Sequence, residues 1–255
     1  MTDIYSAPEA NLTEAVTVDG YGSLEKGIAG DYHFAIGEVI SEAWAKTKGA
    51  KGTFWLAFLI YIAIGFGAMF AIGAVLGVSM MAGGAGEEAG GASMVLSQLG
   101  SQLVSIVVMG PMGAGLFIMA LRRSVNADIS AGMVLNYFGK IVPILLTTIL
   151  MYIMIIIGLI LFILPGIYLA VGYYMAIPLV VEKNLGPWAA LEASRKAVSK
   201  RWFSVFGLFL VLGLINFAGI FTLGILWIWT LPMTLIAFGI LYRNIFGVEA
   251  ETLSS

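Results

Sequence analysis

Four stretches of this chain contain no charged residue and are each long enough to cross a lipid bilayer. They are residues 53–79, 94–121, 141–181 and 203–242. A helix of about 20 apolar residues spans the roughly 30 Å hydrocarbon core of a membrane. Any one such stretch would also suit a buried helix of a soluble domain. Because the stretches follow one another with little charge between them, the sequence predicts an integral membrane protein.

The last two stretches are too long to be single membrane helices. At 1.5 Å per residue, a helix of about 40 residues reaches about 60 Å, twice the thickness of the core. Each must therefore fold back, and helix-breaking residues stand near the midpoints, at Pro165-Gly166 and at 222–224. The sequence predicts an all-α, polytopic fold with six transmembrane helices arranged as three hairpins, at residues 53–79, 94–121, 141–163, 167–182, 203–221 and 225–243.

Composition supports this fold class and excludes several functions. Hydrophobic residues make up 60% of the chain and charged residues 11%, whereas soluble domains contain about 25% charged residues. The net charge of −2 provides no basic field for nucleic acid. The chain has no cysteine, which excludes disulfides, thiolate metal sites and cysteine nucleophiles.

The positions of the basic residues predict the orientation. With six spans both chain ends lie on one side, and all 13 Lys and Arg residues fall on that side. Glu87 and Glu88 are the only charged residues in the linkers on the opposite side. Because cytoplasmic loops are enriched in Lys and Arg, we expect both termini in the cytoplasm. Aromatic belts then follow, with Trp55 and Trp202 at the inner interface and Trp227 and Trp229 at the outer one.

An amphipathic segment precedes each predicted hairpin. These segments begin near Ile36, Ile129 and Trp188, and each repeats apolar residues at helical spacing. We expect three short helices in the inner interface, and we interpret the pattern as a threefold repeat of an interfacial helix and a hairpin. The predicted organisation is a flexible acidic cytoplasmic tail, an interfacial helix, a transmembrane domain and a cytoplasmic C-terminal tail, at residues 1–30, 31–52, 53–247 and 248–255. Residues 1–20 lack the basic and apolar regions of a cleavable signal peptide.

Three segments in the C-terminal two-fifths carry a family resemblance. They read LPGIYLAVGYYMAIPLVVEKNLGPWAALEASRKAVSKRWF, GLINFAGI and LYRNIFG. This region resembles a group of uncharacterised bacterial six-helix membrane proteins, similar to the YciC inner-membrane family and to the membrane domain of some glycerophosphodiester phosphodiesterases. The resemblance implies six spans in a bacterial cytoplasmic membrane. It implies no reaction, because no hydrolase domain accompanies the helices here.

The search for catalytic chemistry gives no candidate. Catalysis within a membrane needs ionisable or metal-binding groups at the site, and we find none inside the predicted spans. His33 is the only histidine, so a histidine pair for a metal is excluded. We therefore predict that the protein is not an enzyme and has neither a metal site nor a cofactor.

Polar side chains inside the spans have two interpretations. Gln98 and Gln102 share one helical face and could meet Asn216 across the bundle. The three could line a polar path for a solute, or they could make hydrogen bonds between helices. Gly73 and Gly77 form a GxxxG pair, which suits internal close contact between helices and also a homo-oligomer.

The most specific functional signal is the basic surface on the inner side. Arg195, Lys196, Lys200 and Arg201 cluster beside Trp202. Such cations anchor topology in any membrane protein, and they also attract anionic lipid by about 1 kcal/mol each. We predict a groove for an anionic lipid head group between this segment and Arg122/Arg123. The leading hypothesis is a scaffold or accessory protein that binds anionic lipid or partner proteins, and the alternative is a passive or lipid-handling transporter.

Overall fold

The computed structural model describes residues 20–83, 95, 98–102 and 105–254, and every regular element within these ranges is helical. The all-α prediction is therefore confirmed for the described part of the chain. The same residues contain six helical stretches long and apolar enough to cross a membrane: Lys51–Val75, Gln98–Ser124, Ala131–Leu161, Ile163–Glu182, Trp202–Phe221 and Trp227–Phe246. Glu87 and Glu88 lie outside the described residues.

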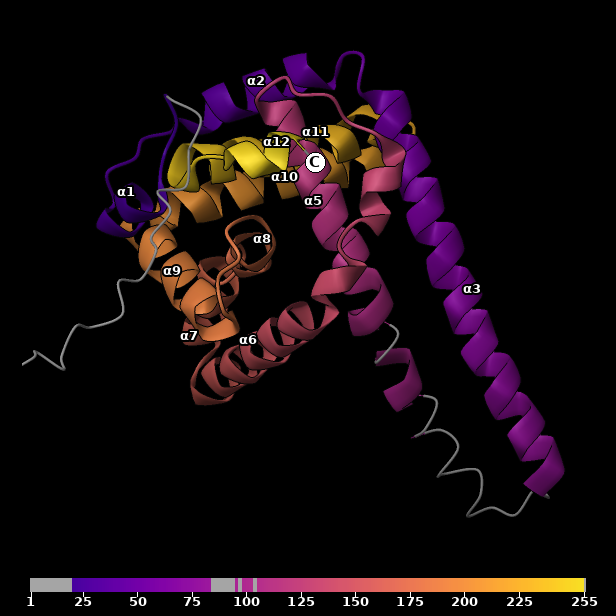
Figure 1. Ribbon diagram of the computed structural model, residues 1–255. Coiled ribbons are helices and arrows are strands. Elements are labelled where there is room, and N and C mark those ends of the chain that lie inside the picture. Colours follow the sequence, from indigo (N-terminus) through magenta and orange to yellow (C-terminus); the bar gives the residue numbers. More distant parts are fainter. Residues whose placement is uncertain (1–19, 84–94, 96–97, 103–104, 255) are drawn as a thin grey trace, which may run out of the picture.

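Figure 1 shows how these helices are arranged. The α-helices in chain order are α1 (Leu24–Ala29), α2 (Ile36–Thr47), α3 (Lys51–Gly83), α5 (Gly110–Ser124), α6 (Ile141–Leu161), α7 (Ile163–Gly172), α8 (Ala176–Glu182), α9 (Pro187–Lys200), α10 (Trp202–Phe221), α11 (Trp227–Phe246) and α12 (Ala250–Ser254). A π-helical turn, η1 (Ser105–Met109), leads into α5, and two 3-10 helices, η2 (Ala131–Leu135) and η3 (Phe138–Lys140), lead into α6.

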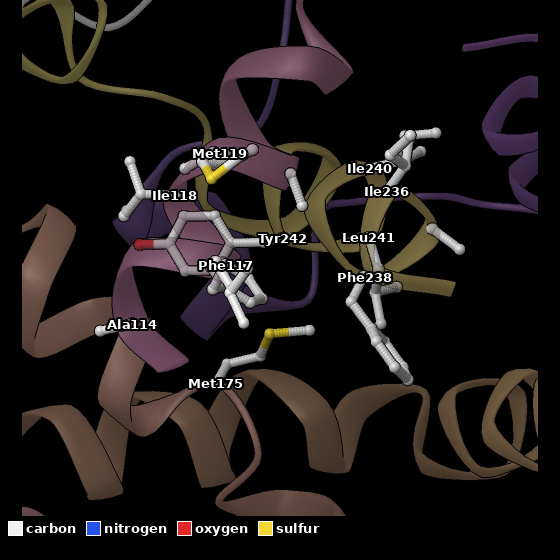
Figure 2. Packing of buried hydrophobic residues seen from close by; sticks show 14 of the residues in the cluster. Ala114, Phe117, Ile118, Met119, Met175, Ile236, Phe238, Ile240, Leu241 and Tyr242 are labelled. Atoms are coloured by element: carbon white, nitrogen blue, oxygen red, sulfur yellow. The ribbon is translucent and has the colours of Figure 1, made fainter. Parts of the chain in front are cut away.

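The core lies where α5 and α11 cross. Figure 2 shows the ring of Tyr242 lying over α5, close to Ile118 and Met119. All three side chains are almost completely buried, and the rings of Phe117 and Tyr242 meet edge to face with centroids 5.5 Å apart. The helices can approach this closely because α11 has Gly239 at the crossing. A Cβ atom there would lie 2.6 Å from the carbonyl oxygen of Ala120.

Helix α3 stands apart from this core. It runs away from the other helices as a long rod (Figure 1), and Phe66 and Phe70 are 74% and 79% exposed. Only lipid can solvate so much apolar surface at low cost, so this exposure fits a membrane helix. Between α3 and η1 lies an apolar groove of about 480 Å³, lined in part by Tyr61, Phe66 and Met109.

The chain reverses between α6 and α7 at Phe162, three residues before the predicted breaker. Phe162 has extended backbone angles, and α7 begins at the next residue. Pro165 lies in the first turn of α7, where no intrahelical partner for its missing N–H is needed. Gly158 and Gly166 permit the close approach of α6 and α7, since a Cβ on Gly158 would lie 3.1 Å from the Gly166 Cα.

The reversal between α10 and α11 occurs at the predicted place. Leu223 and Gly224 both have positive φ angles, and the hydroxyl of Thr222 accepts a hydrogen bond from the Leu226 amide. The side chain of Leu223 is 94% exposed at the tip of this turn.

The fourth predicted span is interrupted, which corrects the prediction of one helix over 167–182. Helix α7 ends at Gly172 and α8 begins at Ala176. The buried hydroxyl of Ser194 on α9 bridges the gap, because it donates to the Gly172 carbonyl and accepts from the Met175 amide. Helix α9 is therefore bonded into the break rather than lying freely on a surface.

Two further segments differ from their predictions. Residues 20–30 do not form a free tail, because they contain α1, whose Gly27 is buried against the backbone of Ile245. The amphipathic segment from Ile129 forms 3-10 helices rather than an α-helix.

The predicted aromatic belts are wrong as drawn. The indole of Trp55 donates to the carbonyl of Ile228 at 3.0 Å, and the amine of Lys51 lies 5.3 Å from the ring centre of Trp229. The predicted inner belt at Trp55 thus touches the predicted outer belt at Trp229. The reason is that α11 packs lengthwise beside α2, so that its first turn reaches the beginning of α3.

Candidate functional site

Segments predicted to face the cytoplasm are joined to one another by hydrogen bonds from their cations. Arg123, at the end of α5, donates to the carbonyls of Lys46 and Lys48, each at 2.8 Å. Lys46 in turn donates to the side-chain oxygen of Asn126 at 2.7 Å. Lys140 donates to the Val181 carbonyl and to the side chain of Asn184. Most of these cations therefore satisfy carbonyl groups at the ends of neighbouring helices.

Arg243 makes the most extensive of these connections. Its guanidinium contacts both carboxylate oxygens of Glu42, at 2.8 and 2.9 Å, and donates to the carbonyl of Ser124. The ring of Tyr21 lies 4.5 Å from the guanidinium carbon. Burial alone would raise the pKa of Glu42, but its hydrogen bonds and charge interactions with Arg243 and Lys46 outweigh this and hold the pKa below its usual value.

Glu182 is a buried carboxylate that the sequence analysis overlooked. It is the last residue of the candidate span Ile163–Glu182 and is 5% exposed, so the statement that no ionisable group lies inside a span fails at this position. It accepts hydrogen bonds from the Tyr242 hydroxyl and the Glu249 amide, and Lys183 lies 3.4 Å away. The signal was present in the sequence: a Glu-Lys pair that ends an apolar helix must find partners when it is buried.

This network also holds the C-terminal segment. Lys183 pairs with Glu249 at 2.5 Å, and the Arg122 guanidinium donates to the carbonyls of Thr252 and Asp128. Residues 248–254 are thus docked on the ends of α5 and α8. Arg122 and Arg123, predicted to bind lipid, are engaged with the protein's own carbonyls.

The cations of α9 fall into two groups. Arg195 and Lys196 share Glu192, at 2.8 and 3.3 Å. The hydrogen bond from Arg195 is the main reason why the pKa of Glu192 is lowered and that of Arg195 is raised. Lys200 and Arg201, at the end of the same helix, have no acidic partner within the described part of the chain.

Lys200 and Arg201 stand at the beginning of α10. This helix has Arg201 as its N-cap, has no side-chain cap and carries no acidic residue in its first turn. The Nε of Arg201 is buried without a hydrogen-bond partner. Next to the two cations, Trp202 stacks on Phe206 with ring centres 5.0 Å apart, and Phe203 is 85% exposed. A helix N-terminus carries partial positive charge, so both charges and free N–H groups here favour an anion.

The predicted polar cluster is not assembled in this structure. The amide nitrogen of Asn216 donates to the hydroxyl of Thr234 at 2.7 Å and to the Leu212 carbonyl. Gln98 and Gln102 are exposed, and no hydrogen bond joins either of them to Asn216 among the described residues. Asn216 therefore makes a hydrogen bond between α10 and α11, which is the second of the two interpretations given above.

The described residues contain no group of three or more His, Cys, Asp or Glu side chains that could hold a metal ion. In comparisons with known proteins, no protein-family model, curated protein or solved structure matches the chain. The class defined here is an all-helical protein with six helices, in its described part, that could cross a membrane. The resemblance to the YciC-like group stays a prediction.

Proposed function

We propose that this chain is a multi-pass membrane protein, without enzymatic activity, whose α9–α10 junction binds the phosphate of an anionic lipid. The observation that carries the proposal is the beginning of α10, where Arg201 takes the N-cap position, Lys200 precedes it, and the first turn has no acidic residue. Helix α10 is one of the candidate spans. Its first turn would then lie at the membrane interface, within reach of lipid phosphates.

The surrounding contacts narrow the predicted site to a few residues. Of the seven predicted residues, Arg122 and Arg123 bond to backbone carbonyls, and Arg195 and Lys196 pair with Glu192. Lys200 and Arg201 remain, with Trp202 and the exposed ring of Phe203 beside them. An aromatic ring beside cations is typical of the interfacial zone of a bilayer.

We place these cations on the cytoplasmic side, as the distribution of basic residues predicts. The hydrogen bonds that join the ends of α2, α5, α8 and α11 support this placement, because all four ends belong to predicted cytoplasmic segments. A bacterial cytoplasmic membrane completes the proposal. Because the site consists of cations and aromatic rings that can hold a lipid, we assign a scaffold or accessory role in which the lipid stays bound.

The test compares two double substitutions that each remove two positive charges from the same region. Purified protein is exposed to nanodiscs or micelles containing phosphatidylglycerol and phosphatidylcholine, and the lipid that stays bound is measured by native mass spectrometry. Lys200→Gln/Arg201→Gln is expected to reduce bound anionic lipid more than tenfold, since each cation contributes about 1 kcal/mol. Arg195→Gln/Lys196→Gln, the matched control, is expected to change it by less than about threefold, because these cations are already paired. Equal retention by both variants and the unaltered protein would show that the cations only anchor topology.

A further inference from the structure

A polar pocket of about 320 Å³ lies beside the proposed lipid site. Its walls include Tyr21, Lys26, Asp31, Tyr32, His33 and Asn244. The pocket forms because the segment that carries α1 is laid over the end of α11. Gly22 makes this approach possible, since its amide donates to the Arg243 carbonyl and a Cβ there would lie 2.4 Å from the Ile245 carbonyl oxygen.

The pocket and the lipid site share a wall. The hydroxyl of Tyr32 donates to the carbonyl of Ala197 on α9 at 2.9 Å, and the guanidinium carbon of Arg201 lies 5.8 Å from the centre of the Tyr32 ring. Burial raises the pKa of Tyr32 to about 12, so the phenol keeps the proton that makes this bond. The stem of Lys200 lies against Gly30, the residue before Asp31.

The groups in the pocket are mixed in charge and hydrogen-bonding character. Lys26 is an exposed cation, and Asp31 and His33 are exposed, with no ion pair or side-chain hydrogen bond among the described residues. The side-chain oxygen of Asn244 accepts from Arg243, which leaves its NH₂ group as a donor. The charged groups of neighbouring elements that contact the walls of the pocket are Arg243, which lies over the ring of Tyr21, and Arg201, which lies over the ring of Tyr32.

A second phosphate would not suit such a pocket, because the Asp31 carboxylate would repel it. A carboxylate and an imidazole accept hydrogen bonds from hydroxyl groups, and an amide NH₂ and an ammonium donate to their oxygens. We infer that the pocket binds the hydroxyl groups of a polyol head group, such as that of phosphatidylglycerol, while its phosphate lies at Lys200 and Arg201. This inference rests on the proposed function and names the lipid class that the site selects.

The test separates the head-group hydroxyls from the charge. Phosphatidylglycerol and phosphatidylmethanol each carry one phosphate diester charge, but only the first has free hydroxyls. Native mass spectrometry of the full-length protein in equal mixtures of the two is expected to show about fivefold more bound phosphatidylglycerol, the factor supplied by one or two neutral hydrogen bonds. Asp31→Ala/His33→Ala is expected to abolish this preference by lowering bound phosphatidylglycerol to the level of phosphatidylmethanol, while bound phosphatidylmethanol stays the same. Both side chains are exposed, so folding should be preserved, which the thermal unfolding temperature checks.

The remaining outcomes are distinct. Equal binding of the two lipids by the unaltered protein, with Lys200→Gln/Arg201→Gln still defective, would overturn the pocket assignment and leave the proposed function standing. Absence of any preference over phosphatidylcholine would overturn the proposed function itself. A third arm adds soluble glycerol 3-phosphate at the concentration of the lipid. If it displaces phosphatidylglycerol, the pocket recognises a soluble solute and the assignment to a lipid is wrong.

Discussion

Arg243 illustrates how this protein keeps a charge at the end of an apolar helix. Its side chain is almost fully buried, yet each edge of the guanidinium meets an acceptor, from Glu42 on one side and the Ser124 carbonyl on another. A buried cation without such partners would cost several kcal/mol. The single residue therefore ties α11 to both α2 and the end of α5.

Glu42→Gln is expected to lower stability by about 1 kcal/mol near pH 7, because the bidentate ion pair is lost at a partly exposed carboxylate. The pKa of Glu42 is lower in the folded state than in the unfolded state. The contribution of Glu42 to stability is therefore fully present above the pKa of the unfolded state, about 4.3, and is lost as the pH falls through the pKa of the folded state. Thermal unfolding of the two proteins in detergent, followed by tryptophan fluorescence, should show a difference at pH 7 that is smaller at pH 3.

Glu38→Gln is the matched control for this substitution. Glu38 lies on the same helix one turn earlier, is exposed, and has no ion pair within the described ranges. Within these ranges, Glu38 interacts only with the partial positive charge of the α2 N-terminus, so the unfolding temperature of Glu38→Gln should fall much less at pH 7 than that of Glu42→Gln. A loss of stability in Glu38→Gln equal to that in Glu42→Gln would mean that the charge of α2, and not its pair with Arg243, matters.

At the scale of elements, the crossing of α5 and α11 is set by the absence of a side chain. The backbones approach where Gly239 faces Ala120, and a Cβ atom would lie 2.6 Å from a carbonyl oxygen that cannot move independently. The large side chains of Phe117, Ile118 and Tyr242 fill the space on either side of this point. Small residues at contacts between membrane helices have this general role.

Gly239→Ala is expected to destabilise the protein by about 1–3 kcal/mol, because the two backbones must separate and the side chains around them lose contact. Gly113→Ala serves as the control on α5, since a Cβ there meets nothing within 4 Å. That substitution should be neutral or stabilising, because alanine is the better helix former. If both variants show the same unfolding temperature, the close approach of α5 and α11 is not a determinant of stability.

The all-helical class and the six apolar stretches long enough to cross a membrane could be predicted from the sequence, because both depend on local apolar length. The positions at which the helices end or reverse were harder to predict. The reversal at Phe162 depends on the close approach of Gly158 to Gly166 across the turn. The break after Gly172 depends on Ser194, which lies on α9. The candidate site was predicted too broadly for the same reason. The sequence shows thirteen cations, but only the fold shows that Arg122 and Arg123 are already bonded and that Lys200 and Arg201 are not accompanied by acids.

For the whole molecule, the central question is how α11 lies relative to α3. Lys51 and Trp229 are neighbours, as are Trp55 and Ile228. Six parallel spans with both termini on one side would instead place the beginning of α3 and the beginning of α11 at opposite faces, about 30 Å apart. The packing of α11 along α2, fixed by Arg243 and Glu42, produces the observed arrangement.

The chain has no native cysteine, so this arrangement can be tested by introducing pairs. Lys51→Cys/Trp229→Cys in isolated membranes, treated with a bismaleimide that spans one side-chain contact, is expected to give an intramolecular cross-link that changes mobility on a denaturing gel. Lys51→Cys/Phe162→Cys is the control pair and should give none, because Phe162 belongs to the turn between α6 and α7. If neither pair reacts although both cysteines are accessible to a single maleimide, the beginnings of α3 and α11 do not lie side by side in the membrane-bound protein. Cross-linking of the first pair alone would establish that they do.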